Sequence, residues 1–191
     1  MIENPISRFS QKYRGHLLHL VAEEYLAFVC RHLPGIEGII LRRLLYGKLF
    51  KRLGMKSLIY SGVFLTHTYG IEVGDYFSIN SGALIDGRGG IKIGSGVMIG
   101  PHTVIVSSSH QTNDFRKPMT SLDHIMEPVT ISDDVWIGAN AFIRGGVEIG
   151  RGAIIGAGSV VLRNVPEFMV AAGNPAKIVK DRRMASSPGR N

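Results

Sequence analysis

The 191-residue chain is 45% hydrophobic and 19% charged, a balance that excludes an intrinsically disordered protein. Its formal net charge of +7 is uneven, because residues 1–60 hold ten Lys or Arg against four Glu while the rest is nearly balanced. The single cysteine, Cys30, excludes a disulfide framework, and no apolar run reaches the roughly 18 residues of a membrane span. Since residues 1–10 also lack an apolar signal-peptide core, we expect a cytoplasmic protein.

Residues 1–56 are expected to form an N-terminal helical segment. Ser7 or Ser10 can cap a first helix, and Pro34-Gly35 breaks it. A second helix then runs from about Ile36 to Leu53. Apolar residues fall at helical spacing in both: Phe9, Tyr13, Leu17, Val21, Tyr25, Phe28 and Val29, then Ile36, Ile39, Ile40, Leu44, Leu45, Leu49 and Leu53.

The charge of this segment allows two interpretations. Basic residues crowd much of the remaining surface of the second helix: Arg42, Arg43, Lys48, Lys51 and Arg52. In the first interpretation, both helices pack on the domain that follows and cover its open end. In the second, the second helix also rests on the inner face of an anionic membrane, since surface Lys and Arg contribute about 1 kcal/mol each there.

From Leu53 onward, aliphatic residues recur every six positions. The anchors are Leu53, Ile59, Leu65, Val73, Ile79, Ile85, Ile93, Ile99 and Ile105, then Ile131, Ile137, Ile143, Ile149, Ile155 and Val161. A β-sandwich would alternate with a period of two, whereas a period of six suits short strands separated by corners. Three such strands close a coil of 18 residues, and each anchor then stacks on the anchor of the next coil.

The anchors divide the repeat into five coils and one insertion. The coils are 53–70, 73–90, 93–110, 131–148 and 149–166, with two extra residues after each of the first two. A long insertion is expected at 111–130. Glycine often follows the anchor, as Gly74, Gly94, Gly100, Gly138, Gly150 and Gly156 do, which favours tight corners.

Two segments carry a resemblance to a known family. Residues 135–161, VWIGANAFIRGGVEIGRGAIIGAGSVV, and 170–180, VAAGNPAKIVK, resemble the hexapeptide-repeat acyltransferases. Within that family the chain looks most similar to galactoside, maltose and xenobiotic O-acetyltransferases and to surface-polysaccharide acetyltransferases. The resemblance implies a left-handed parallel β-helix over 57–167, acetyl-CoA as donor, a homotrimer, and active sites between subunits. In 168–191 we expect a turn, a short helix that caps the last coil, and a disordered tail.

His110 is the strongest candidate for the catalytic base. One imidazole can take the proton of an attacking hydroxyl and return it to the leaving thiolate. Residues 107–110, SSSH, precede the insertion, and 127–138, EPVTISDDVWIG, follow it; by resemblance this pattern makes His110 the base. A corner histidine bonded to Ser107 or to the loop is the structural alternative. Glu127 or Asp114 can orient the ring, and the sequence does not choose between them.

Other residues are candidates for binding. Asn80 and Asp86, one coil below His110, are expected to contact sugar hydroxyls, although Asp86 equally suits a turn before Gly87. Trp136, the only tryptophan, should project outward and form a wall for the pantetheine arm and the acceptor. The resemblance assigns backbone contacts with pantetheine to Ala139 and Ala157. The candidates for the phosphates of CoA are Arg163, Lys177 and Lys180, with solvated surface charge as the alternative.

The sequence therefore predicts an acetyl-CoA-dependent O-acetyltransferase that needs no metal and binds no nucleic acid. Its acceptor would be a sugar or glycan, used in cell-surface polysaccharide or glycoconjugate synthesis. Three alternatives stay open. The acceptor can be an amino sugar, giving an N-acetyltransferase; the fold can be a non-catalytic sugar-binding scaffold; or it can be a metalloenzyme like the γ-class carbonic anhydrases, which would need His102, His110 and His124 as zinc ligands.

Overall fold

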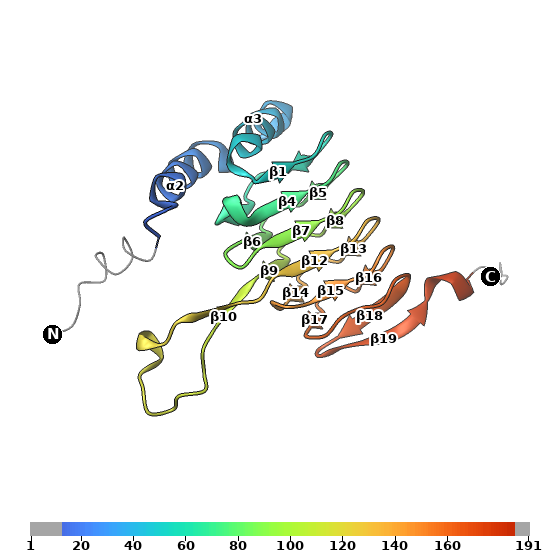
Figure 1. The fold of residues 1–191 in the computed structure, drawn as a ribbon. Helices are drawn as coiled ribbons and strands as arrows, with labels where there is room; N and C mark the ends of the chain where they lie inside the picture. Colours follow the sequence, from blue (N-terminus) through green and yellow to red (C-terminus); the bar gives the residue numbers. More distant parts are fainter. Residues whose placement is uncertain (1–12, 186–191) are drawn as a thin grey trace.

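The computed structural model describes residues 13–185, so the predicted caps Ser7 and Ser10 and the end of the predicted tail lie outside the described residues. Two helices, α2 (Leu17–Arg31) and α3 (Gly35–Leu49), precede a parallel β-solenoid of about six turns (Figure 1). Within the described part of the chain, no helix is long and apolar enough to cross a bilayer.

Three parallel sheets form the sides of the solenoid. Sheet A contains β1 (Arg52–Leu53), β4 (Ile71–Val73), β7 (Ile91–Ile93), β12 (Val129–Ile131) and β15 (Glu148–Ile149). Sheet B contains β2 (Leu58–Ile59), β5 (Ser78–Ile79), β8 (Met98–Ile99), β13 (Trp136–Ile137), β16 (Ile154–Ile155), β18 (Met169–Gly173) and β19 (Ala176–Asp181). Sheet C contains β3 (Phe64–Thr66), β6 (Leu84–Asp86), β9 (Val104–Val106), β14 (Phe142–Ile143) and β17 (Val160–Val161).

The predicted stacking of anchors is confirmed. In sheet C, Leu65 pairs with Ile85, Ile85 with Ile105, and Ile143 with both Ile105 and Val161. These side chains are buried, and the anchors of sheets A and B stack in the same way. Each coil therefore buries its apolar face only against its neighbours, which explains why the six-residue step persists on both sides of the insertion.

The glycines after the anchors serve close packing rather than an unusual backbone conformation. A Cβ on Gly100 would lie 2.6 Å from the backbone nitrogen of Ala139, and one on Gly138 would lie 2.6 Å from that of Ala157. Neither glycine has a positive φ; that conformation falls two residues later, for example at His102 and Asn140. A side chain after the anchor would thus push apart the corners of consecutive coils.

The extra residues of the first two coils lie at one corner, between sheets C and A. In the first coil they form the 3-10 helix η1 (Thr68–Gly70), and in the second they form the turn 87–90. The insertion leaves the solenoid at this same corner, because it follows β9 of sheet C and ends at β12 of sheet A. We call this edge of the solenoid the CA corner.

The insertion is a two-stranded arm. β10 (Ser108–His110) pairs antiparallel with β11 (His124–Met126), and a loop containing the 3-10 helix η2 (Met119–Ser121) joins them. In Figure 1 the arm extends well away from the solenoid. The insertion differs at both ends from the predicted range 111–130. The arm already begins at Ser108, and Val129–Ile131 is the solenoid strand β12. The six-residue count could not show that 108–110 pair with a strand of the arm.

The two helices cover the first coil, as one interpretation predicted, but through an unexpected face. α3 contacts β1 and β2, and α2 contacts β3 and α3. The residues buried there include Ala27, Cys30, Tyr46 and Leu49, whereas most of the predicted apolar stripe points away. The second helix also ends at Leu49 rather than Leu53, because Arg52–Leu53 pairs with β4 as the first solenoid strand.

The prediction of a C-terminal helix was wrong in its main part. Ala176–Asp181 forms β19, which pairs antiparallel with β18 after the turn at Asn174, and only the 3-10 turn η3 (Arg182–Ala185) follows. β18 continues sheet B by pairing with β16. The last coil is therefore covered at this side by a hairpin, whose backbone groups pair with an open strand edge in a way that a helix cannot.

Candidate active site

His110 lies at the end of β10, at the base of the exposed arm. Its side chain is exposed, and its ring packs against that of His124 with 4.1 Å between centroids and an interplanar angle of 44°. The two residues are opposite each other in the β10–β11 ladder. His110 is thus held on a paired strand rather than on a free loop, and its side chain is exposed.

The two carboxylates expected to orient His110 have other partners. Glu127 pairs with Arg144, with 3.2 Å between Oε1 and Nη2, and Asp114 pairs with Lys117, with 3.3 Å between Oδ2 and Nζ. Within the chain, His124 is the aromatic neighbour of the His110 ring. Both histidines are visible in the sequence, but their contact is not, because only the antiparallel register of the arm brings the two rings together.

Trp136 and two lysines share the outer face of sheet B. Trp136 is 49% exposed and lies between Met98 and Ile154 on the neighbouring strands. Val170 pairs with Ile154 further along the sheet, and Lys180 is the cross-strand partner of Val170. Because side chains opposite each other in a ladder point to the same face of the sheet, Lys180 and Trp136 lie on the same outer face of sheet B.

Lys177 belongs to the same face. It is opposite Ala172, two residues after the outward-facing Val170 on β18, and both lysines are exposed. An aromatic wall, an apolar strip and two cations therefore follow one another along the outside of sheet B. That order suits an extended thioester arm that ends in phosphate groups.

Ala139 and Ala157 lie at the corner between sheets B and C, one coil apart. The carbonyl of Ala139 accepts a hydrogen bond of 2.8 Å from the amide of Gly158, and Ala157 is exposed. Arg163 is exposed too, but it follows β17 and so lies between sheets C and A, away from the face of Trp136. Within one chain, Arg163 and the two lysines do not form a single phosphate site.

Asn80 serves the solenoid itself. Its Nδ2 donates to the carbonyl oxygen of Ile99 in the next coil at 3.1 Å, and the side chain is half-buried. An amide at this place closes the corner between sheets B and C, which is a structural role that the sequence interpretation did not consider. The prediction of a sugar contact at Asn80 gains no support from this geometry.

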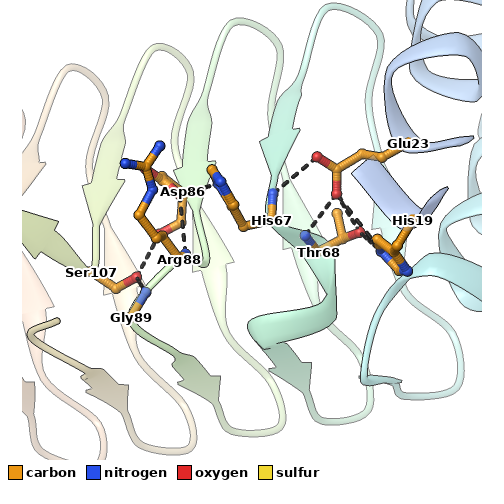
Figure 2. A network of polar contacts seen from close by, with 8 residues as sticks. All are labelled: His19, Glu23, His67, Thr68, Asp86, Arg88, Gly89 and Ser107. Atoms are coloured by element: carbon orange, nitrogen blue, oxygen red, sulfur yellow. Dashed lines mark hydrogen bonds and ion pairs between the residues drawn. The ribbon is translucent and has the colours of Figure 1, made fainter. Parts of the chain in front are cut away.

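Asp86 belongs to a polar network at the CA corner that sequence analysis missed (Figure 2). Its Oδ1 accepts from His67 Nδ1 at 2.8 Å and from the backbone amide of Arg88 at 3.1 Å. The Ser107 hydroxyl, at the root of the arm, donates to the Asp86 carbonyl at 2.7 Å and accepts from the amide of Gly89 at 2.8 Å. Asp86 thus combines the turn role with a hydrogen bond to a buried histidine.

The network continues from His67 into α2. The buried Glu23 carboxylate accepts from the amide of His67 at 2.9 Å, and from the amide and hydroxyl of Thr68 at 2.7 and 2.6 Å. The Thr68 hydroxyl also lies 2.9 Å from His19 Nε2. The two extra residues per coil were the sequence signal for this corner, but nothing in the sequence showed that a glutamate of α2 would reach it.

A hollow of about 420 Å³ lies between α2 and this corner. Polar groups of its lining come from Glu23, Glu24, Thr66, His67 and Arg88, and apolar ones from Leu17, Leu20, Val21 and Tyr25. The arm that carries His110 leaves from the same corner, directly after Ser107. Among residues 13–185, the corner and the hollow included, no cluster of three or more His, Cys, Asp or Glu suited to a metal is found.

Replacing Asp86 with Asn is expected to destabilise the fold in a pH-dependent way. Burial alone raises the pKa of Asp86, but the hydrogen bond from His67 and the charges of His67 and Arg88 outweigh it, so the pKa is lowered overall. A carboxylate with a lowered folded-state pKa stabilises fully above its unfolded pKa, about 3.9, and loses that contribution as the pH falls through the folded value. Urea unfolding at several pH values should show the two proteins converging in acid; a difference that does not change with pH would contradict this.

Comparison with known proteins supports the interpretation of the repeat. The family model of the bacterial transferase hexapeptide (six repeats) matches residues 128–163. Galactoside O-acetyltransferase of Escherichia coli is 30% identical over 141 residues, which cover 73% of this chain and 68% of that protein. A Saccharomyces cerevisiae relative, named as a candidate acetyltransferase, is 42% identical over 110 residues; the match covers 58% of this chain and 55% of the yeast protein.

The fold matches a solved member of the same group. The hexapeptide-repeat acetyltransferase VCA0836 of Vibrio cholerae is 32% identical, with a TM-score of 0.78 over 86% of this chain and 91% of that one. Its complex with acetyl coenzyme A matches with a TM-score of 0.77. The repeat, the sequence identity and the overall likeness of the folds agree, and the chain therefore belongs to the hexapeptide-repeat acetyltransferases.

Proposed function

We propose that this protein transfers the acetyl group of acetyl-CoA to a hydroxyl of a sugar, with His110 as the general base. The observation that carries the proposal is the exposed imidazole on the paired base of the arm, in a chain whose relatives are acetyltransferases. Support for the donor comes from the acetyl-CoA complex of the similar Vibrio protein. Support for a sugar comes from the name of the E. coli relative.

In the proposed reaction, a ring nitrogen of His110 takes the proton from the acceptor hydroxyl while its oxygen attacks the thioester carbonyl. The carbon–sulfur bond then breaks, and the imidazolium returns the proton to the thiolate of CoA. Trp136 would hold the pantetheine arm and border the acceptor, and Lys177 and Lys180 would pair with phosphates. Backbone groups of Ala139 and Ala157 would line the arm's path. Asp86 would contact the acceptor at the corner that it shares with Arg88.

The place of the reaction in the cell is part of the same proposal. We place it in the cytoplasm, in the synthesis of a surface polysaccharide or glycoconjugate, a role that follows from the family resemblance. Incubation with acetyl-CoA and a panel of sugars, amino sugars and glycans, followed by detection of free thiol, tests it. Acetylation only of amines would replace the sugar hydroxyl as acceptor. CoA binding without thiol release on any acceptor would instead support the non-catalytic scaffold.

A shared active site is expected to show itself by complementation. His110 lies on the arm at the CA corner, while Trp136 faces outward from sheet B, so one chain does not bring them together. In the proposed homotrimer, each site would combine His110 of one copy with Trp136 of the next. Neither His110→Ala nor Trp136→Ala should be active alone. In trimers assembled at random from equal amounts of both, about one quarter of the sites would combine an intact His110 with an intact Trp136, so about one quarter of the wild-type activity should return. The acetyl-transfer assay after verified subunit exchange decides, and no recovery would place both residues in one copy's site.

A further inference from the structure

The outward surfaces of α2 and α3 are apolar. Nine large hydrophobic side chains along them are between 40% and 86% exposed: Leu18, Val21, Tyr25, Phe28, Val29, Leu33, Ile36, Ile40 and Leu44. In α2 they follow the three- and four-residue steps of one helix face, and in α3 they are spaced by four. We call this surface the outer helix face.

Both helices are apolar on two sides, since Ala27, Cys30 and Tyr46 are buried against the solenoid while the outer helix face is exposed. Two of their charged residues, Glu23 and Arg42, also point inward and are buried, with Glu23 bonded to His67 and Thr68, and Arg42 bonded to three carbonyl oxygens. A surface helix normally buries its apolar stripe and exposes its charges. The outer helix face is therefore not left over from packing on the solenoid, and an exposed apolar patch of this kind usually marks a contact.

Cations border the outer helix face. Arg14 precedes Leu18 by four residues and Lys48 follows Leu44 by four, and both are exposed at the two ends of this face. The exposed acidic residues on the two helices are Glu24 and Glu37, and Lys51, just beyond α3, is paired with Glu72 of sheet A. Beyond residue 60 the chain is nearly neutral, with twelve Lys or Arg and eleven Asp or Glu. The basic excess of the chain thus lies in its N-terminal segment, and an anionic lipid surface complements its charge.

We propose that the outer helix face docks on a lipid bilayer that contains anionic headgroups. Apolar and aromatic side chains such as Tyr25 and Phe28 would enter the boundary between headgroups and acyl chains, and the bordering cations would contact the headgroups. The two helices lie together at the N-terminal end of the solenoid (Figure 1), and the side chains of the outer helix face are exposed there. Contact of this type is peripheral and does not require a spanning helix.

Docking would also orient the hollow at the CA corner. Val21 and Tyr25 belong both to the outer helix face and to the lining of the hollow, whose polar side includes His67 and Arg88. The hollow therefore opens beside the proposed lipid contact. Docking itself is independent of the acetyl transfer proposed above, since it depends on residues other than His110 and Trp136.

Vesicle flotation without acetyl-CoA tests the proposal. The full-length protein should float with vesicles of phosphatidylcholine and phosphatidylglycerol at low salt, and binding should weaken as salt screens the charges. The double variant Phe28→Gln, Ile40→Gln should bind at least about tenfold more weakly, because both apolar side chains leave the interface. Lys48→Glu should weaken binding only to the anionic vesicles.

The matched control is Phe115→Gln, which changes an aromatic residue that is 89% exposed on the arm and should bind as the wild type does. Thermal melting would confirm that all variants are folded. Equal binding to pure phosphatidylcholine would overturn the role of anionic lipid, and absence of binding at low salt would overturn the docking. A change of molecular mass of the double variant in light scattering, without vesicle binding by the wild type, would show instead that the outer helix face joins two copies. None of these results affects the acetyl-transfer assay.

Discussion

Replacing His110 with Ala should lower the turnover number for acetyl transfer by at least about a hundredfold, the loss typical when a general base is removed. The proposed reaction uses the exposed His110 ring, at the base of the arm, as its proton acceptor. Since the side chain contributes little to packing, the affinity for CoA and the melting temperature should stay close to those of the wild type. Steady-state kinetics with acetyl-CoA and an accepted sugar provide the measurement.

The control for this prediction is His102→Asn. His102 is also an exposed histidine, but it occupies a solenoid corner with a φ of 57°, a conformation that asparagine tolerates well. The variant should keep nearly full turnover. If His110→Ala also kept nearly full turnover, His110 would have no role in the proton transfers, and His124 on the opposite strand would become the residue to test.

Replacing Arg42 with Met should cost about 3 kcal/mol or more of unfolding free energy, because it removes three hydrogen bonds from a charged donor, each of which contributes about 1.5–3 kcal/mol. Arg42 is 1% exposed. Its guanidinium donates to the carbonyl oxygens of Ile59 at 2.8 Å, Cys30 at 3.0 Å and Leu33 at 2.7 Å. It thus joins α3 to the end of α2 and to the first coil, and its burial lowers the pKa of the guanidinium.

The neighbouring residue offers a matched control for this second prediction. Arg43 is partly exposed and donates to one carbonyl oxygen, that of Gly54, at 3.0 Å. Arg43→Met should therefore cost only about 1 kcal/mol. Urea unfolding of both variants at one protein concentration measures the difference. An Arg42→Met variant with an unchanged midpoint would mean that the helices do not depend on this side chain for their attachment.

The solenoid was largely determined by the sequence itself. Each anchor has to face inward because the coil has no other way to bury it, so a six-residue step fixes both the three-sided coil and the pairing of Leu65 with Ile85 and of Ile85 with Ile105. The same counting located the CA corner, where extra residues accumulate, and the place where the arm leaves. Trp136 was correctly expected to face outward, because its position in the hexad alternates with a buried anchor.

Only the tertiary structure decided which way the helices face and what the chain does after the last coil. A helical period shows that Val21, Tyr25 and Phe28 share a face, but it does not show whether the solenoid covers that face; the hydrogen bonds of Glu23 turn it outward. Residues 176–181 became a strand because the backbone of β18 was available to pair with them. The contacts of Asp86 with His67, and of His110 with His124, likewise join positions from separate strands, and their distance in space is set by the stacking of coils and by the register of the arm.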